Sequence, residues 1–155
     1  MPSAALCGAD AAAGSARKVG SMTNRPDIAV RTVCLDCEDA NAMAAFYGGL
    51  LGWEPTFTEP DWVLMRNPAG SVGLSFQAEP GYRPPTWPEE ADLQQKMIHL
   101  DVLVTPTEGQ TPEEALAAAL EVAVSLGGTP SAHQLRDDLR VVLDPSGHPL
   151  CLFLD

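Results

Sequence analysis

Residues 61–70, DWVLMRNPAG, recur as residues 138–147, DLRVVLDPSG. A second match, Leu51-Gly52 with Leu126-Gly127, has an offset of 75 residues, against 77 for the longer stretch. Each long copy is an apolar run followed by an Asn-Pro or Asp-Pro turn, which is typical of a strand that reverses direction. We therefore predict two similar units in tandem. Each is too small to bury a sheet alone, so the two are expected to share one core.

The first unit is predicted to be a strand, a helix and three short strands. A β-rich run over residues 28–37 ends before acidic residues that can cap a helix. The helix is predicted over residues 41–51, because Met43, Phe46, Tyr47 and Leu50 form one apolar stripe and Gly52 follows as a stop. The strands expected after the helix cover residues 53–57, 62–66 and 72–77.

The second unit repeats this order. A strand is predicted over residues 97–104, and Thr111, Pro112 and Glu114 supply the N-cap, the first position and the capping-box glutamate of a helix. The helix is expected to end near Leu126, before two glycines. Strands are then predicted over residues 131–134, 139–143 and 150–154. The fold class that follows is α+β, with two β-α-β-β-β units.

Composition divides the chain into a tail, a domain and an internal arm. Residues 1–24 are rich in Ala, Gly and Ser and lack a pattern that buries a face, so we predict a disordered tail. Residues 25–155 form the predicted domain, with units at about 28–78 and 97–155. The arm between the units, residues 79–96, is dense in Pro, which continues neither a helix nor a central strand.

The balance of charge limits the classes of partner. The chain has a net charge of −12 at pH 7, so we expect neither a nucleic-acid partner nor a membrane partner. Its apolar runs are far shorter than the roughly 20 residues that cross a bilayer. Four cysteines without a recognisable secretion signal predict reduced thiols in a cytoplasmic protein. Cys34 and Cys37 have redox-motif spacing, but strand positions three apart face opposite sides, which disfavours a redox role.

Several motifs stand in a specific order along the chain. They are Asp39-x6-Phe46-Tyr47-x3-Leu51-Gly52-Trp53, the Asn-Pro-Ala-Gly and Asp-Pro-Ser-Gly-His-Pro turns, Phe76-Gln77, Tyr82-Arg83-Pro84-Pro85, Trp87-Pro88, His99-Leu100-Asp101 and Cys151-Leu152. This order resembles the vicinal oxygen chelate superfamily of glyoxalases, bleomycin resistance proteins and dioxygenases, and its bacterial glyoxalase-like branch in particular. The resemblance implies a curved mixed sheet around a cup-like cavity.

The resemblance also implies where a metal would be held. Catalytic members bind a divalent metal through the first and last strands of the units. The matching positions here are Thr32, His99, Cys151 and either Leu74 or, after a one-residue slip, Ser75 and Gln77. This set lacks the carboxylates that hard divalent ions need, so we predict no standard metal site and no cofactor. A zinc site of His99, Cys151 and Cys34 is the alternative.

Strand alternation groups side chains by face. If Val33, Leu35 and Cys37 face the helix, then Thr32, Cys34 and Asp36 face the other side, and His99 shares a face with Asp101 in the same way. His99 and Asp101 are the candidate catalytic residues, as a general base beside a carboxylate. The alternative is a hydrogen-bonded cavity histidine without a catalytic role. His148 is assigned to its Gly-His-Pro turn.

Ligand-binding candidates combine aromatic and polar side chains, a set that suits a flat organic molecule. They are Thr32, Cys34, Trp62, Gln77, Trp87, Cys151 and Phe153. For Trp87, plain packing, a cover over the cavity mouth and a subunit contact remain alternatives.

The function expected from these residues is the binding of a small organic molecule by a homodimer without the standard metal site. The alternative is a metal-dependent or His-assisted enzyme of the lyase, isomerase or dioxygenase type. A third is a protein-interaction module that uses the Pro-rich arm. Glyoxalase I activity is disfavoured, because that chemistry needs a Lewis-acid metal and a carboxylate base.

Overall fold

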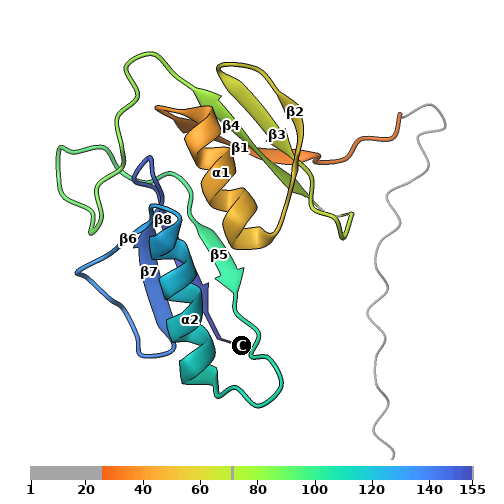
Figure 1. Ribbon diagram of the computed structural model, residues 1–155. Coiled ribbons are helices and arrows are strands. Elements are labelled where there is room, and N and C mark those ends of the chain that lie inside the picture. Colours follow the sequence, from red (N-terminus) through yellow and green to blue (C-terminus); the bar gives the residue numbers. More distant parts are fainter. Residues whose placement is uncertain (1–25, 71, 155) are drawn as a thin grey trace, which may run out of the picture.

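Two units follow one another in the computed structural model (Figure 1), which describes residues 26–70 and 72–154. The first unit consists of β1 (Thr32–Cys37), α1 (Ala40–Leu51), β2 (Pro55–Thr58), β3 (Trp62–Met65) and β4 (Gly73–Ala78). The second consists of β5 (Leu100–Leu103), α2 (Pro112–Ser125), β6 (Thr129–Pro130), β7 (Leu139–Leu143) and β8 (Pro149–Phe153). The predicted α+β fold of two β-α-β-β-β units is confirmed. The tail predicted at residues 1–24 lies outside the described residues.

Each unit forms its own mixed sheet of four strands. The strand orders are β1-β4-β3-β2 and β5-β8-β7-β6, and the outer strand that begins each unit runs parallel to its neighbour. The remaining neighbours pair antiparallel. α1 packs on β3 and β4, and α2 packs on β6, β7 and β8 (Figure 1). We call the face of each sheet that carries no helix its open face.

Local sequence explains where both helices begin. The Asp39 carboxylate accepts hydrogen bonds from the backbone N–H groups of Asn41 and Ala42 at the start of α1. Thr111 and Glu114 form the predicted capping box of α2. Gly52 ends α1 with a φ of 68°, in the left-handed region that glycine tolerates best. No described helix is long and apolar enough to cross a membrane.

Three predicted strands differ from the observed ones by more than two residues at one end. The strand expected from residue 28 begins at Thr32, because β4 starts at the position opposite Thr32 and offers no earlier partner. The strand expected from residue 97 begins at Leu100, opposite Leu150; β8 extends only one position further, to Pro149, which has no N–H to donate. The strand expected over residues 131–134 is wrong: β6 ends at Pro130, and the side-chain amide of Gln134 pairs with both backbone groups of Val141 instead.

The two units share one apolar core, as the repeat predicts. Buried side chains of both sheets and both helices belong to a single cluster. Phe46 of α1 lies against Gly128, where an added Cβ would come within 3.0 Å of the ring. Gly49 of α1 faces Leu126 in the same way, at 2.5 Å from a side-chain carbon. Each unit therefore fits into the other at glycines that leave room for a large side chain.

A chain of polar side chains also joins the units. Tyr47, which is 1% exposed, donates a hydrogen bond of 3.0 Å to the Asp144 carboxylate in the other unit. The same carboxylate accepts the backbone N–H groups of Ser146 and His148 and lies 3.0 Å from His148 Nδ1. His148 Nε2 then lies 3.1 Å from the hydroxyl of Tyr82 on the arm. The Gly-His-Pro turn that contains His148 thus connects both units and the arm through hydrogen bonds.

Alkaline pH is expected to weaken the fold. Burial raises the pKa of the Cys37 thiol from 9.0 to about 12, and burial together with the nearby Asp144 carboxylate raises the pKa values of Tyr47 and Tyr82 above 10.0. A raised folded-state pKa means that the stability is complete below the unfolded pKa and is lost as the pH rises toward the folded one. Urea denaturation should therefore give a constant free energy of unfolding up to about pH 9 and a falling one above it. A flat profile up to about pH 11 would contradict this.

Candidate functional site

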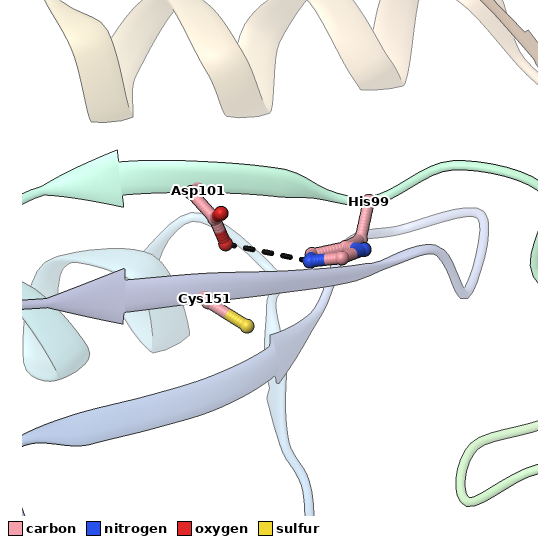
Figure 2. Close-up of side chains that lie close together, drawn as sticks. All are labelled: His99, Asp101 and Cys151. Carbon is pink, nitrogen blue, oxygen red and sulfur yellow. Dashed lines mark ion pairs between the residues drawn. The ribbon is translucent and has the colours of Figure 1, made fainter.

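Three side chains with proton- or metal-binding atoms converge on the open face of the second sheet. His99, Asp101 and Cys151 each bring one such atom, and all three atoms lie within 4.8 Å of one another. The His99 Nε2 atom is 3.4 Å from Asp101 Oδ1. Figure 2 shows the Asp101 carboxylate directed at the imidazole ring, with the Cys151 sulfur on the neighbouring strand. The predicted proximity of His99 and Asp101 is confirmed.

The sheet register explains this convergence. Asp101 on β5 lies directly opposite Cys151 on β8, and His99 precedes Asp101 by two positions, just before β5 begins. Side chains two positions apart along an extended chain face the same side. The side chains that alternate with Cys151, Leu150 and Leu152, are 0% exposed in the core. The apolar pattern of β8 therefore fixes Cys151 on the open face.

The electrostatics of the cluster favour a protonated thiol. Burial, followed by the negative charge of Asp101, raises the pKa of Cys151 above 9.0. The imidazole and the carboxylate are more exposed, with 44% and 64% of their side chains accessible. When His99 Nε2 donates its proton to Asp101, Nδ1 remains as an acceptor that can take a proton from a bound molecule. The arrangement thus has the geometry of an imidazole base beside an orienting carboxylate, as predicted for His99 and Asp101.

The cluster lies in a hollow that we call the second-unit hollow. Its volume is about 300 Å³, and besides the cluster it is lined by Leu135, Arg136, Asp138, Leu139, Phe153 and Leu154. Arg136 and Asp138 form an ion pair with each other at its rim. The remaining wall is apolar, because Leu139 of β7 lies opposite Phe153 of β8. A small organic molecule with an apolar body and one polar group suits such a site.

The donor set also fits one kind of metal ion. An imidazole nitrogen, a carboxylate oxygen and a thiolate are ligands that Zn²⁺ accepts, and three protein ligands leave a fourth position open. The set is poor for Mg²⁺ or Ca²⁺, which need a shell of oxygens. Cys34, the third ligand of the alternative zinc site, is not in this group; Asp101 takes its place. A bound Zn²⁺ would supply Lewis-acid polarisation at the open position.

Other predicted ligand residues lie elsewhere. Thr32 and Trp62 line a hollow on the open face of the first sheet, which we call the first-unit hollow. Cys34 lines a third hollow of about 440 Å³, between β1, the arm and His148. Gln77 is exposed on the open face and donates a hydrogen bond to Glu79. Phe153 and Cys151 line the second-unit hollow as expected, so the predicted set is divided among separate hollows.

Trp87 lies on the arm, packed against the second unit. Its ring centroid is 6.1 Å from that of His133, and the Lys96 ammonium lies 4.6 Å from the ring centroid on its face. The indole N–H is buried, and within the described residues it has no hydrogen-bond partner. These contacts fit the packing interpretation, with one donor left for water or a further group.

The structure decides between the two registers left open for β4. Leu74 is part of the core, whereas Ser75 faces the open side, where its hydroxyl lies 3.5 Å from that of Thr32. The one-residue slip is therefore the observed register. Sequence reasoning missed Leu135 and Leu139 of the second-unit hollow; the pairing of Leu139 with Phe153 could have been found from strand alternation along β7.

Comparison with known proteins places this chain in a family. The glyoxalase-like domain family matches residues 32–153, which is most of the chain. The chain belongs to this family. No curated protein sequence matches this glyoxalase-like protein significantly.

Several solved structures share the fold at low sequence identity. A glyoxalase-related enzyme from Fulvimarina pelagi is 21% identical, with a TM-score of 0.58 over 82% of this chain and 88% of that one. A glyoxalase/bleomycin resistance protein/dioxygenase family enzyme from Burkholderia phytofirmans PsJN is 18% identical, with a TM-score of 0.56 over 79% and 95%. A fosfomycin resistance protein from Listeria monocytogenes, solved with Mn(II) and a dihydroxypropylphosphonic acid, is 13% identical, with a TM-score of 0.57 over 83% and 90%. With the family match over residues 32–153, the predicted superfamily is confirmed.

Proposed function

We propose that this glyoxalase-like protein binds a small organic molecule in the second-unit hollow, with His99 as its polar contact. The observation that carries the proposal is the His99–Asp101 pair, 3.4 Å apart, in a hollow whose other lining combines apolar side chains with the Arg136–Asp138 ion pair. Asp101 holds the imidazole, and Phe153 and Leu139 offer apolar surface to the body of the ligand. The hollow, about 300 Å³ in volume, is at the small end of the range of ligand sites.

A metal-dependent or His-assisted enzyme of the lyase, isomerase or dioxygenase type is the second candidate. It is favoured by one specific observation, the convergence of His99, Asp101 and Cys151 within 4.8 Å. In such an enzyme these three residues would hold Zn²⁺, which would supply Lewis-acid polarisation of the ligand. The thiol must lose its proton to bind the ion, so binding releases a proton.

We also propose that the protein is a homodimer in the cytoplasm. Two apolar side chains on or just before the edge strand β5, Leu103 and Met97, are 51% and 89% exposed and would be covered by a second copy. The described cysteines are free thiols, in keeping with a reducing compartment. Light scattering coupled to size-exclusion chromatography would give the mass of the particle; a monomer at all concentrations would contradict the proposal.

Thermal-shift screening of small organic molecules is the test of the leading function. A ligand at a hundredfold excess over its Kd is expected to stabilise the protein by about 2.7 kcal/mol. The shift should disappear in His99→Gln and persist in His133→Gln, which alters a histidine outside the hollow. A shift that survives His99→Gln would overturn the proposed site.

Titration with Zn²⁺ separates the two candidates. Stoichiometric binding that weakens more than about tenfold in Cys151→Ser, but not in the matched control Cys34→Ser, would favour the metal-dependent enzyme. Equal binding by both variants, or none by the wild type, would leave the metal-free function as the better account.

A further inference from the structure

The largest hollow described on this protein lies away from His99, on the open face of the first sheet. This first-unit hollow has a volume of about 760 Å³. Phe57 and Trp62 form its aromatic wall, with ring centroids 5.6 Å apart and planes tilted by 57°. Leu64 adds a buried apolar floor, and the hydroxyl groups of Thr32 and Thr56 are the neutral polar groups of the lining. The wall is therefore shaped for a flat apolar body.

Two arginines border the same hollow, one from each side of β4. Arg31 immediately precedes β1 and Arg66 immediately follows β3, and both strands flank β4 in the sheet. Gly73, the first residue of β4, lies close to the backbone at both arginines. Its N–H donates to the Arg31 carbonyl at 2.9 Å, while a Cβ at Gly73 would lie 3.2 Å from the Arg66 Cα. The glycine thus allows the two arginine-bearing segments to approach β4 closely at one edge of the sheet.

Neither guanidinium is neutralised within the part of the chain that the structure describes. Arg31 and Arg66 make no side-chain hydrogen bond or ion pair there, whereas Arg136 pairs with Asp138 and Lys96 pairs with Glu89. No carboxylate lines the first-unit hollow. The chain as a whole has a net charge of −12. Two unpaired cations beside an aromatic wall therefore make the electrostatic potential at this hollow more positive than over the rest of the surface.

We propose that the first-unit hollow binds a planar organic anion, specifically an aromatic carboxylate. The ring lies against Trp62 and Phe57, and the carboxylate is received by the guanidinium groups of Arg31 and Arg66, whose planar donors suit carboxylate oxygens. This inference goes beyond the function proposed above, because it uses the other sheet and shares no lining residue with the second-unit hollow.

The test uses 1-naphthoate as the probe and the full chain as the protein. Binding is followed by isothermal titration calorimetry and by the indole N–H signal of Trp62 in NMR spectra. Two matched probes separate the contributions: 1-naphthalenemethanol keeps the ring without the charge, and acetate keeps the carboxylate without the ring. We expect 1-naphthoate to bind more tightly than both and to bind less tightly as the salt concentration rises.

Variants then assign the contacts. Arg31→Gln with Arg66→Gln should weaken 1-naphthoate binding about tenfold, discounted for the exposure of both side chains. Arg83→Gln is the control, because Arg83 is also exposed and without a described ion pair but lies outside the hollow. Equal binding of the neutral probe, or a double variant within about twofold of the wild type, would overturn the proposal.

One further variant distinguishes a failure of the anion site from a failure of the site proposed at His99. His99→Gln should leave 1-naphthoate binding unchanged, and the double arginine variant should leave the thermal shifts of second-unit ligands unchanged. If 1-naphthoate binding depends on His99 instead of the arginines, the proposed anion site is wrong while the site at the second unit stands.

Discussion

Asp144→Ala is expected to lower the free energy of unfolding by about 3 kcal/mol, because it breaks a buried charged network. The carboxylate is fully buried, and it accepts hydrogen bonds from the Tyr47 hydroxyl and two backbone N–H groups beside its contact with His148. Its removal leaves the Tyr47 hydroxyl buried in the core without an acceptor. Urea denaturation at neutral pH, monitored by tryptophan fluorescence, measures the loss.

Two companion variants make this result interpretable. Asp138→Ala removes an exposed carboxylate that forms an ion pair with exposed Arg136, and it should change the urea midpoint little. Tyr47→Phe removes the donor but keeps the ring, and should cost about 1 kcal/mol. If Asp144→Ala unfolds at the same urea concentration as Asp138→Ala, the network does not hold the two units together.

Phe46→Ala should destabilise the protein by about 4 kcal/mol, near the middle of the range for a buried phenylalanine. Its ring is 1% exposed, packs edge-on against Tyr47 at 5.0 Å between centroids and lies over Gly128 of the other unit. The cavity left behind lies between the two units, so one substitution weakens both. Thermal unfolding should therefore remain a single transition at a lower Tm.

Phe57→Ala provides the matched control for this core substitution. Phe57 is 45% exposed on the edge strand β2, so its loss should cost less than about 1 kcal/mol. Two separate transitions in Phe46→Ala, one for each unit, would show that the units fold independently and would contradict the shared core.

Sequence patterns predicted the elements better than their ends. The apolar stripe and caps gave α1 within one residue, and strand β7 was predicted with its observed bounds, Leu139–Leu143. The errors in strand bounds occur where a neighbouring strand, rather than the local sequence, determines how far a strand extends. Ile28 and Met97 are apolar but 73% and 89% exposed, because no neighbouring strand extends far enough to pair with them. The strand predicted near Gln134 does not form, because the side-chain amide of Gln134, and not its backbone, bonds to Val141.

The candidate site was predictable where it depends on one strand. His99 and Asp101 are two positions apart, and alternation alone places them together. Their meeting with Cys151, 50 positions after Asp101, depends on the parallel register of β5 and β8, which no local pattern gives. The approach of the Arg31 and Arg66 backbones to Gly73 was missed for the same reason. Sequence therefore predicted the candidates, and the register decided which of them meet.

The bond between Tyr47 and Asp144 has a consequence for the order of folding. The two residues are 97 positions apart, so the bond closes a very long loop and can form only after both units are largely in place. An interaction that forms late in folding contributes little to the transition state, so it is expected to slow unfolding more than it speeds folding. We therefore expect Tyr47→Phe to shorten the lifetime of the native protein and to leave its rate of formation nearly unchanged.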